Sequence, residues 1–75
     1  MNMRMYLVKQ RKKLNLSMRK AAKIAELDFH HYYRIETGQI RLVNFIVLCK
    51  IGQAMSIELN ELFAAEAEYL SYSSD

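Results

Sequence analysis

The side chains best suited to chemical recognition lie in the short segment 29–36. They combine two aromatic rings, an imidazole and a guanidinium at helical spacing: Phe29, His30, Tyr33 and Arg34. On a helix of 3.6 residues per turn these positions fall on or near one face, opposite Tyr32 and Ile35, which we assign to the core. Arginine can donate two hydrogen bonds to guanine, histidine can donate or accept at a base edge, and aromatic rings can press on thymine methyl groups. The segment predicts a helix that reads the DNA major groove.

Other interpretations of these residues remain open. Phe29 lies at the edge of the expected helix and can also fold into the core, Tyr33 can also bond a phosphate, and Arg34 can also be a solvated surface charge. His30 and His31 are adjacent, so on a helix they point about 100° apart. We therefore expect no metal site.

Two helix starts position this face. Ser17 can cap a helix over 18–25, and Asp28 can cap the helix over 29–36, which Gly38 ends. The small residues Ala21, Ala22 and Ala25 allow close approach of a second helix. Two helices of about two turns, joined by three or four residues, must cross steeply, which is the helix-turn-helix arrangement.

From about residue 7 to residue 63 the chain resembles the Cro/C1-repressor (XRE) family of helix-turn-helix proteins. The matching residues occur in the family's order and spacing: Arg11, Leu14, Leu16, Ser17, Ala22, Asp28, Arg34, Ile35, Glu36, Gly38, Glu61, Leu62 and Phe63. The resemblance implies a compact five-helix lambda-repressor-like DNA-binding domain. It also implies an ion pair between Arg11 and Glu36, and places Phe29, His30, Tyr33 and Arg34 at the groove-facing positions.

Two residues depart from the family pattern. Glu26 stands where the family usually has the turn glycine, which implies either strain or a different turn geometry. Met18 stands where members often place a glutamine that contacts the DNA backbone. We expect the phosphate contacts to come from polar residues at the start of the second helix and after the motif: Ser17, Arg19, Lys20, Thr37, Gln39 and Arg41.

Helical periodicity over the whole chain predicts five helices, at about 5–14, 18–25, 29–36, 45–55 and 57–69. Asn44 and Ser56 are the expected caps of the last two helices, and residues 71–75 are expected to fray. Gly52 inside a helix predicts close packing against a neighbour. The remaining expected inward-facing residues are Leu7, Leu14, Phe45, Leu48, Ile51, Met55, Leu59, Leu62 and Phe63.

Composition favours one all-helical domain over residues 1–75, with no proline and only two glycines. The single cysteine, Cys49, is expected to be buried and forms no internal disulfide. No signal peptide and no apolar stretch of membrane-spanning length is apparent, so we expect a soluble cytoplasmic protein. Residues 1–25 carry eight Lys or Arg and no acid, whereas residues 51–75 carry five acids and no base. This split indicates a polyanionic partner at one end.

These observations predict a transcriptional regulator that acts as a repressor and binds double-stranded DNA sequence-specifically at a near-palindromic operator. We expect no cofactor, and the interpretation leaves room for a regulatory protein partner. A homodimer is expected, because one small domain buries too little DNA surface for strong specific binding. Candidate interface residues are the surplus apolar positions Met55, Leu59, Ala65, Tyr69 and Leu70. The alternative is an adaptor or antitoxin-type module whose basic face docks on an acidic partner. We expect no enzyme, since no carboxylate cluster, activated nucleophile or phosphate loop is present.

Overall fold

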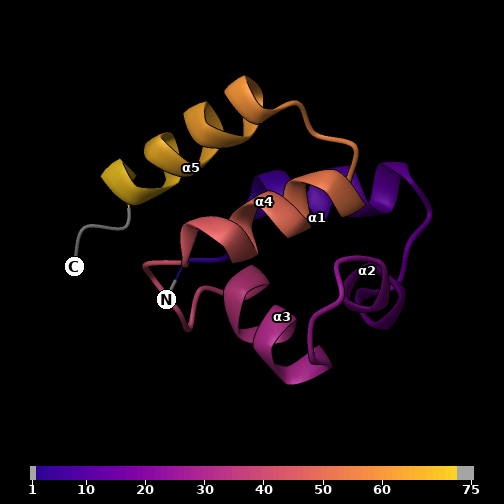
Figure 1. Ribbon diagram of the computed structural model, residues 1–75. Coiled ribbons are helices and arrows are strands. Elements are labelled where there is room, and N and C mark those ends of the chain that lie inside the picture. The colour runs from indigo at the N-terminus through magenta and orange to yellow at the C-terminus, as the bar shows by residue number, and fades with distance from the viewer. Residues whose placement is uncertain (1, 73–75) are drawn as a thin grey trace.

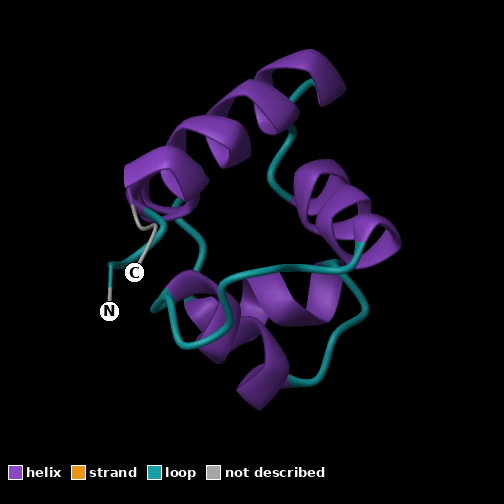
Figure 2. Cartoon of the chain, turned by 90° about the vertical axis from the view of Figure 1, so that its left-hand side faces the viewer, coloured by secondary structure: helices purple, strands orange, loops and turns teal. Residues whose placement is uncertain are grey.

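Five helices form the regular structure of residues 2–72, the part of the chain that this computed structural model describes. They are α1 (Met5–Lys13), α2 (Met18–Ile24), α3 (Phe29–Glu36), α4 (Phe45–Ala54) and α5 (Leu59–Tyr72). Helices α2 and α3 lie at one end of the molecule and α5 at the other, with α1 and α4 between them (Figure 1). The predicted all-helical fold is confirmed: every described segment in Figure 2 is a helix or a loop.

Three of the four predicted N-caps are confirmed. Ser17 Oγ accepts from the backbone N–H of Lys20, Asp28 Oδ2 from that of His30, and Asn44 Oδ1 from that of Ile46. These bonds satisfy N–H groups that have no partner within the helix.

The prediction for Ser56 is wrong. This residue has a φ of 57°, and its N–H donates to the Gln53 carbonyl, so it belongs to the turn that ends α4. Helix α5 begins at Leu59, two residues later than expected, and runs to Tyr72. Residues 71 and 72, which we expected to fray, are therefore helical. Residues 73–75 lie outside the described part.

Left-handed backbone conformations mark the ends of α1, α2 and α3. Asn15 lies just after α1 with a φ of 57°, and Gly38 follows α3 with a φ of 86°. Glu26 has a φ of 59° in the turn between α2 and α3. Of the two possibilities raised by this glutamate, strain is therefore the correct one. A left-handed residue with a Cβ atom costs about 1–2 kcal/mol.

The main core lies where α1, α2, α3 and α4 meet. Tyr32 and Ile35 are fully buried, as predicted from their spacing on α3. Cys49 is only half-buried, so its predicted place in the core is wrong. The cluster of buried residues is Leu7, Ala21, Ala22, Ala25, Tyr32, Ile35, Ile51 and Met55.

Helix α5 packs on α4 at Gly52, where a Cβ atom would lie 2.6 Å from Leu62 Cδ2. The predicted close approach is thereby confirmed. Four residues predicted for the core are exposed, because no other helix covers them fully: Leu14 by 37%, Phe45 by 63%, Leu59 by 51% and Phe63 by 36%.

None of the described helices combines the length and apolar character needed to cross a bilayer.

Candidate nucleic-acid interface

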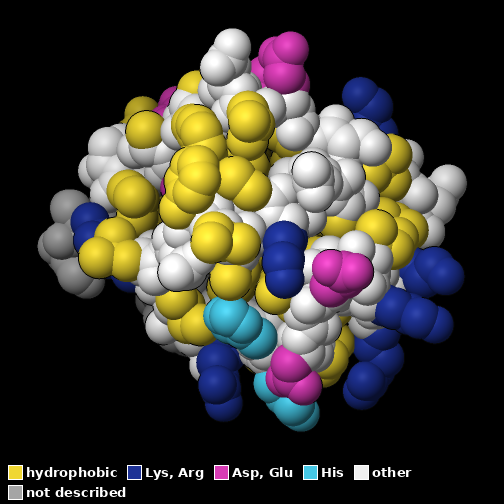
Figure 3. All heavy atoms as spheres, viewed as in Figure 1, with side chains coloured by type: hydrophobic (Ala, Val, Ile, Leu, Met, Phe, Trp, Pro, Cys, Tyr) yellow, Lys and Arg dark blue, Asp and Glu magenta, His cyan; other side chains and the backbone are white. Residues whose placement is uncertain are grey.

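Helix α3 presents a mixed polar and aromatic face to solvent. Its inward face is occupied by Tyr32 and Ile35, so the residues on the other side point outward. His30 and Arg34 are exposed, and Tyr33 is 39% exposed. In Figure 3 the two histidine side chains lie in the lower part of the molecule, where α3 lies in Figure 1. The side chains predicted for base recognition are therefore accessible together.

Phe29 is half-buried and links α2 to α3. The guanidinium carbon of Arg19 lies 4.3 Å from the centre of the Phe29 ring, a cation–π contact between the two helices. The same ring lies 5.5 Å from the His30 ring and 6.0 Å from the Tyr33 ring. Phe29 thus neither enters the core nor stands alone; it supports a continuous surface of three rings and one cation.

The predicted pair of Arg11 and Glu36 is present and fixes the end of α3 to α1. Arg11 Nε and Nη2 donate to the two carboxylate oxygens of Glu36, both at 2.9 Å, and Nη1 donates to the Leu16 carbonyl. Tyr32 Oη donates to Glu36 Oε1 at 2.6 Å. The hydrogen bond to Glu36 raises the pKa of Arg11, while burial and the same carboxylate raise the pKa of Tyr32. The pair keeps α3 in a fixed orientation.

The cationic surface is smaller than the sequence count indicated. Arg4 and Arg11 are buried and paired with Glu66 and Glu36, so neither adds net charge to the surface. Six of the eight basic residues in 1–25 remain exposed: Lys9, Lys12, Lys13, Arg19, Lys20 and Lys23. They lie on α1 and α2, and α2 is the helix that packs most extensively on α3.

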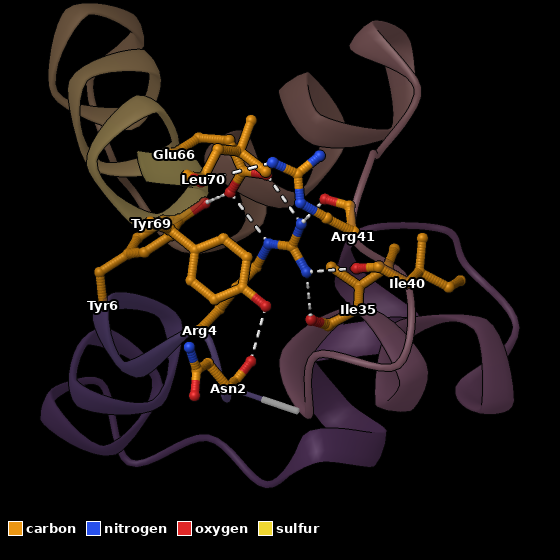
Figure 4. Close-up of polar contacts among 9 residues, drawn as sticks. All are labelled: Asn2, Arg4, Tyr6, Ile35, Ile40, Arg41, Glu66, Tyr69 and Leu70. Atoms are coloured by element: carbon orange, nitrogen blue, oxygen red, sulfur yellow. Dashed lines mark hydrogen bonds and ion pairs between the residues drawn. The ribbon is translucent and has the colours of Figure 1, made fainter. Parts of the chain in front are cut away.

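The residues after α3 that were predicted to touch phosphates have different surroundings. Thr37 Oγ1 donates to the Tyr33 carbonyl, and Gln39 Nε2 donates to Thr37 Oγ1 at 3.4 Å. Arg41 Nη2 instead donates to the Leu70 carbonyl of α5 at 3.4 Å. Thr37 and Gln39 thus lie together directly after α3, whereas the Arg41 side chain is directed towards α5 (Figure 4).

Sequence reasoning missed the buried pair of Arg4 and Glu66, counting Arg4 among the surface cations. One signal was readable: Glu66 follows Leu62 by four residues, so both lie on the same face of a helix. A carboxylate on a buried face needs a charged partner. The sequence does not indicate which basic residue is the partner of Glu66, because Arg4 and Glu66 are 62 residues apart.

The predicted dimer interface needs one correction. Met55 has no exposed surface and belongs to the core, so it cannot contact a second protomer. Leu59 is exposed, and Ala65, Tyr69 and Leu70 are half-buried. Large exposed apolar side chains gather instead on α4, α5 and the loop before α4: Leu42, Phe45, Ile46, Leu59 and Phe63. We call these five residues the α4–α5 patch.

The rings of Phe45 and Phe63 lie 5.5 Å apart and join the two helices within this patch. In Figure 3, hydrophobic side chains gather on the surface over the region that α4 and α5 occupy in Figure 1. A separate shallow cleft of about 270 Å³ lies between the N-terminal residues and α5. Its lining residues are Met3, Met5, Tyr6, Ala65, Glu68, Tyr69 and Tyr72.

Comparisons with protein-family models, with curated proteins and with solved structures found no match to this chain. The resemblance to the Cro/C1-repressor family therefore stays a prediction that depends on the residues of this chain.

Proposed function

We propose that this chain is a helix-turn-helix protein of the Cro/C1-repressor type that binds double-stranded DNA sequence-specifically and represses transcription by occluding a promoter. The observation that carries the proposal is the outward face of α3, where an imidazole, a guanidinium and aromatic rings are accessible together beside a helix rich in exposed cations. A major groove admits one α-helix and displays hydrogen-bonding groups and thymine methyls along its floor.

The outward-facing side chains of α3 would recognise the bases. Arg34 is suited to donate two hydrogen bonds to a guanine, and His30 to bond a neighbouring base edge. The Tyr33 and Phe29 rings supply apolar contact for thymine methyl groups. Because Phe29 is held by Arg19, its position is set before DNA arrives.

Phosphate contacts flank α3 on both sides. Ser17, Arg19 and Lys20 supply them at the start of α2, and Thr37 and Gln39 supply them after α3. Such contacts fix the register of the protein on the duplex and carry no sequence information. Arg41 is left out of this set, because its guanidinium already contacts α5.

A homodimer would double the DNA contact, and the α4–α5 patch is the surface we propose for it. The side chains of Phe45, Ile46 and Leu42 are each more than 60% exposed. Contiguous apolar surface of this kind marks an interaction site on many soluble proteins. The two recognition helices of the dimer would read half-sites about 34 Å apart.

Selection of bound fragments from random double-stranded DNA tests this function. We expect an enriched, near-palindromic motif whose affinity falls steeply with salt, because bound counterions are released. Arg34→Ala should weaken binding to that motif by roughly 5–150-fold, corresponding to about 1–3 kcal/mol, and should change non-specific binding far less.

Lys50→Ala on α4 is the matched control, since it removes a cation that is not among the proposed contacts. Recovery of no enriched motif, or salt-insensitive binding, would refute the proposed function. Equal loss on specific and random DNA would show that Arg34 touches only phosphate.

A further inference from the structure

The guanidinium of Arg4 is fully buried and lies at the centre of a hydrogen-bond network outside the proposed DNA contacts (Figure 4). Its Nε and Nη2 donate to the two carboxylate oxygens of Glu66 on α5, at 2.9 and 2.8 Å. Tyr6 Oη donates to Glu66 Oε1 at 2.7 Å. The carboxylate therefore neutralises the cation and is itself satisfied.

The other N–H groups of Arg4 bind three backbone carbonyls. Nη1 donates to the Ile35 and Ile40 carbonyls, both at 2.7 Å, and Nη2 donates to the Arg41 carbonyl at 2.6 Å. Ile35 lies in the last turn of α3, where a positive charge is favourable. Ile40 and Arg41 belong to the loop that follows. The loop is thus folded around one fixed cation.

The chemistry of this centre requires arginine. Its five N–H groups form a rigid planar fork, and all five are used by the five bonds described above. The Tyr69 ring covers the guanidinium, with its centre 4.3 Å from the guanidinium carbon. A lysine ammonium has only three N–H groups and cannot match this pattern.

The segment around Arg4 also holds the start of the same loop. The backbone N–H of Arg4 donates to the Glu36 carbonyl at 2.8 Å, and Tyr69 Oη donates to the Asn2 carbonyl at 2.6 Å. A Cβ atom on Gly38 would collide with the Asn2 carbonyl. The loop is therefore held at Gly38 on one side and at Ile40 and Arg41 on the other, with Gln39 between them.

We infer that Arg4 is a positioning residue for DNA binding: it holds the loop 37–41 in the shape in which Thr37 and Gln39 reach phosphates. Through Glu66 it also connects that shape to α5. This inference rests on the proposed function. Arg4 itself touches no DNA, because its guanidinium has no exposed surface.

The double variant Arg4→Met/Glu66→Leu tests this role. It replaces both charges by apolar side chains, so no charge is left buried without a partner. The Ile35, Ile40 and Arg41 carbonyls then lose their donor and the loop is released. We expect weaker binding to the selected operator, because the phosphate hydrogen bonds of Thr37 and Gln39 are lost. Both side chains are uncharged and release no counterion, so the slope of log K against log salt should stay that of the wild type. The preferred base sequence should not change.

The core variant Ile51→Ala is the matched control. It removes packing from a fully buried residue of α4 that makes no side-chain hydrogen bond to the loop. Measured well below its unfolding temperature, it should keep the wild-type affinity for the operator. A purely structural role for Arg4 predicts the same unchanged affinity in Arg4→Met/Glu66→Leu.

A double-mutant cycle adds a second readout. Gln39→Ala should weaken binding in the wild type and have little further effect in Arg4→Met/Glu66→Leu, because the loop contact is already lost. Additive losses would overturn the inference. If Arg4→Met/Glu66→Leu does not fold, Arg4→Lys gives the same test, and a wild-type operator affinity in Arg4→Lys would equally overturn it. Failure of the wild type to select any DNA motif refutes the proposed function instead.

Discussion

Removing Arg11 should be among the most damaging changes in this chain. The variant Arg11→Met leaves the Glu36 carboxylate fully buried with only the Tyr32 hydroxyl as a side-chain donor. Breaking a buried ion pair from one side costs about 3–5 kcal/mol. A chain of 75 residues has a free energy of unfolding of about 4–11 kcal/mol. The change therefore removes a large fraction of the total stability.

Urea unfolding followed by circular dichroism measures this loss, and thermal unfolding should show a decrease in Tm of at least about 12 °C. Lys12→Met is the matched control, because it removes an exposed cation from the next position of α1 and should change stability by less than about 0.5 kcal/mol. The double variant Arg11→Met/Glu36→Leu should be more stable than Arg11→Met, since it strands no carboxylate. A loss below about 1 kcal/mol in Arg11→Met, or a double variant less stable than the single one, would refute this reasoning.

Three further outcomes are expected. Glu26→Gly should raise the free energy of unfolding by up to about 1 kcal/mol, because it removes a Cβ atom from a left-handed position; a decrease in urea unfolding would contradict this. Gly38→Ala should destabilise the fold and decrease Tm strongly, because its Cβ atom would strike the Asn2 carbonyl; an unchanged Tm would show that the N-terminal segment does not cross there. Burial raises the pKa of Tyr6 and Tyr32, so both hydroxyls are neutral in the fold. The free energy of unfolding should therefore be full below about pH 10 and fall as the pH rises further, because the unfolded tyrosines ionise there. The variant Tyr6→Phe/Tyr32→Phe should lose this alkaline fall, and an equally steep fall in that variant would contradict the raised pKa values.

The positions on α3 were predictable because local chemistry determines them. Asp28 and Gly38 bound the helix, and the spacing of Tyr32 and Ile35 places their side chains on one face. Once that face enters the core, the opposite one must point outward. Ser56 shows the limit of such reasoning. Serine suits a helix N-cap, but this residue instead adopts the left-handed conformation in the turn that ends α4.

Contacts between distant segments were not predictable in the same way. Periodicity places Phe45 and Phe63 on apolar faces but does not say whether another helix covers them, and both are exposed. The same applies to charge. Nothing local distinguishes Arg4, which turns inward, from the neighbouring exposed cations. Only the position of Glu66 on the face of Leu62 hinted that a basic residue must enter the protein.

The separation of Arg4 and Glu66 has a consequence for synthesis on the ribosome. The cation is made 62 positions before its carboxylate partner. Until α5 emerges, the guanidinium has no counter-ion and water remains its best partner, so the N-terminal segment cannot settle across the end of α3. Helices α1 to α4 can associate earlier, but the loop after α3 should acquire its final shape only when the last helix docks. Ordering of that loop is therefore expected to be a late event in folding.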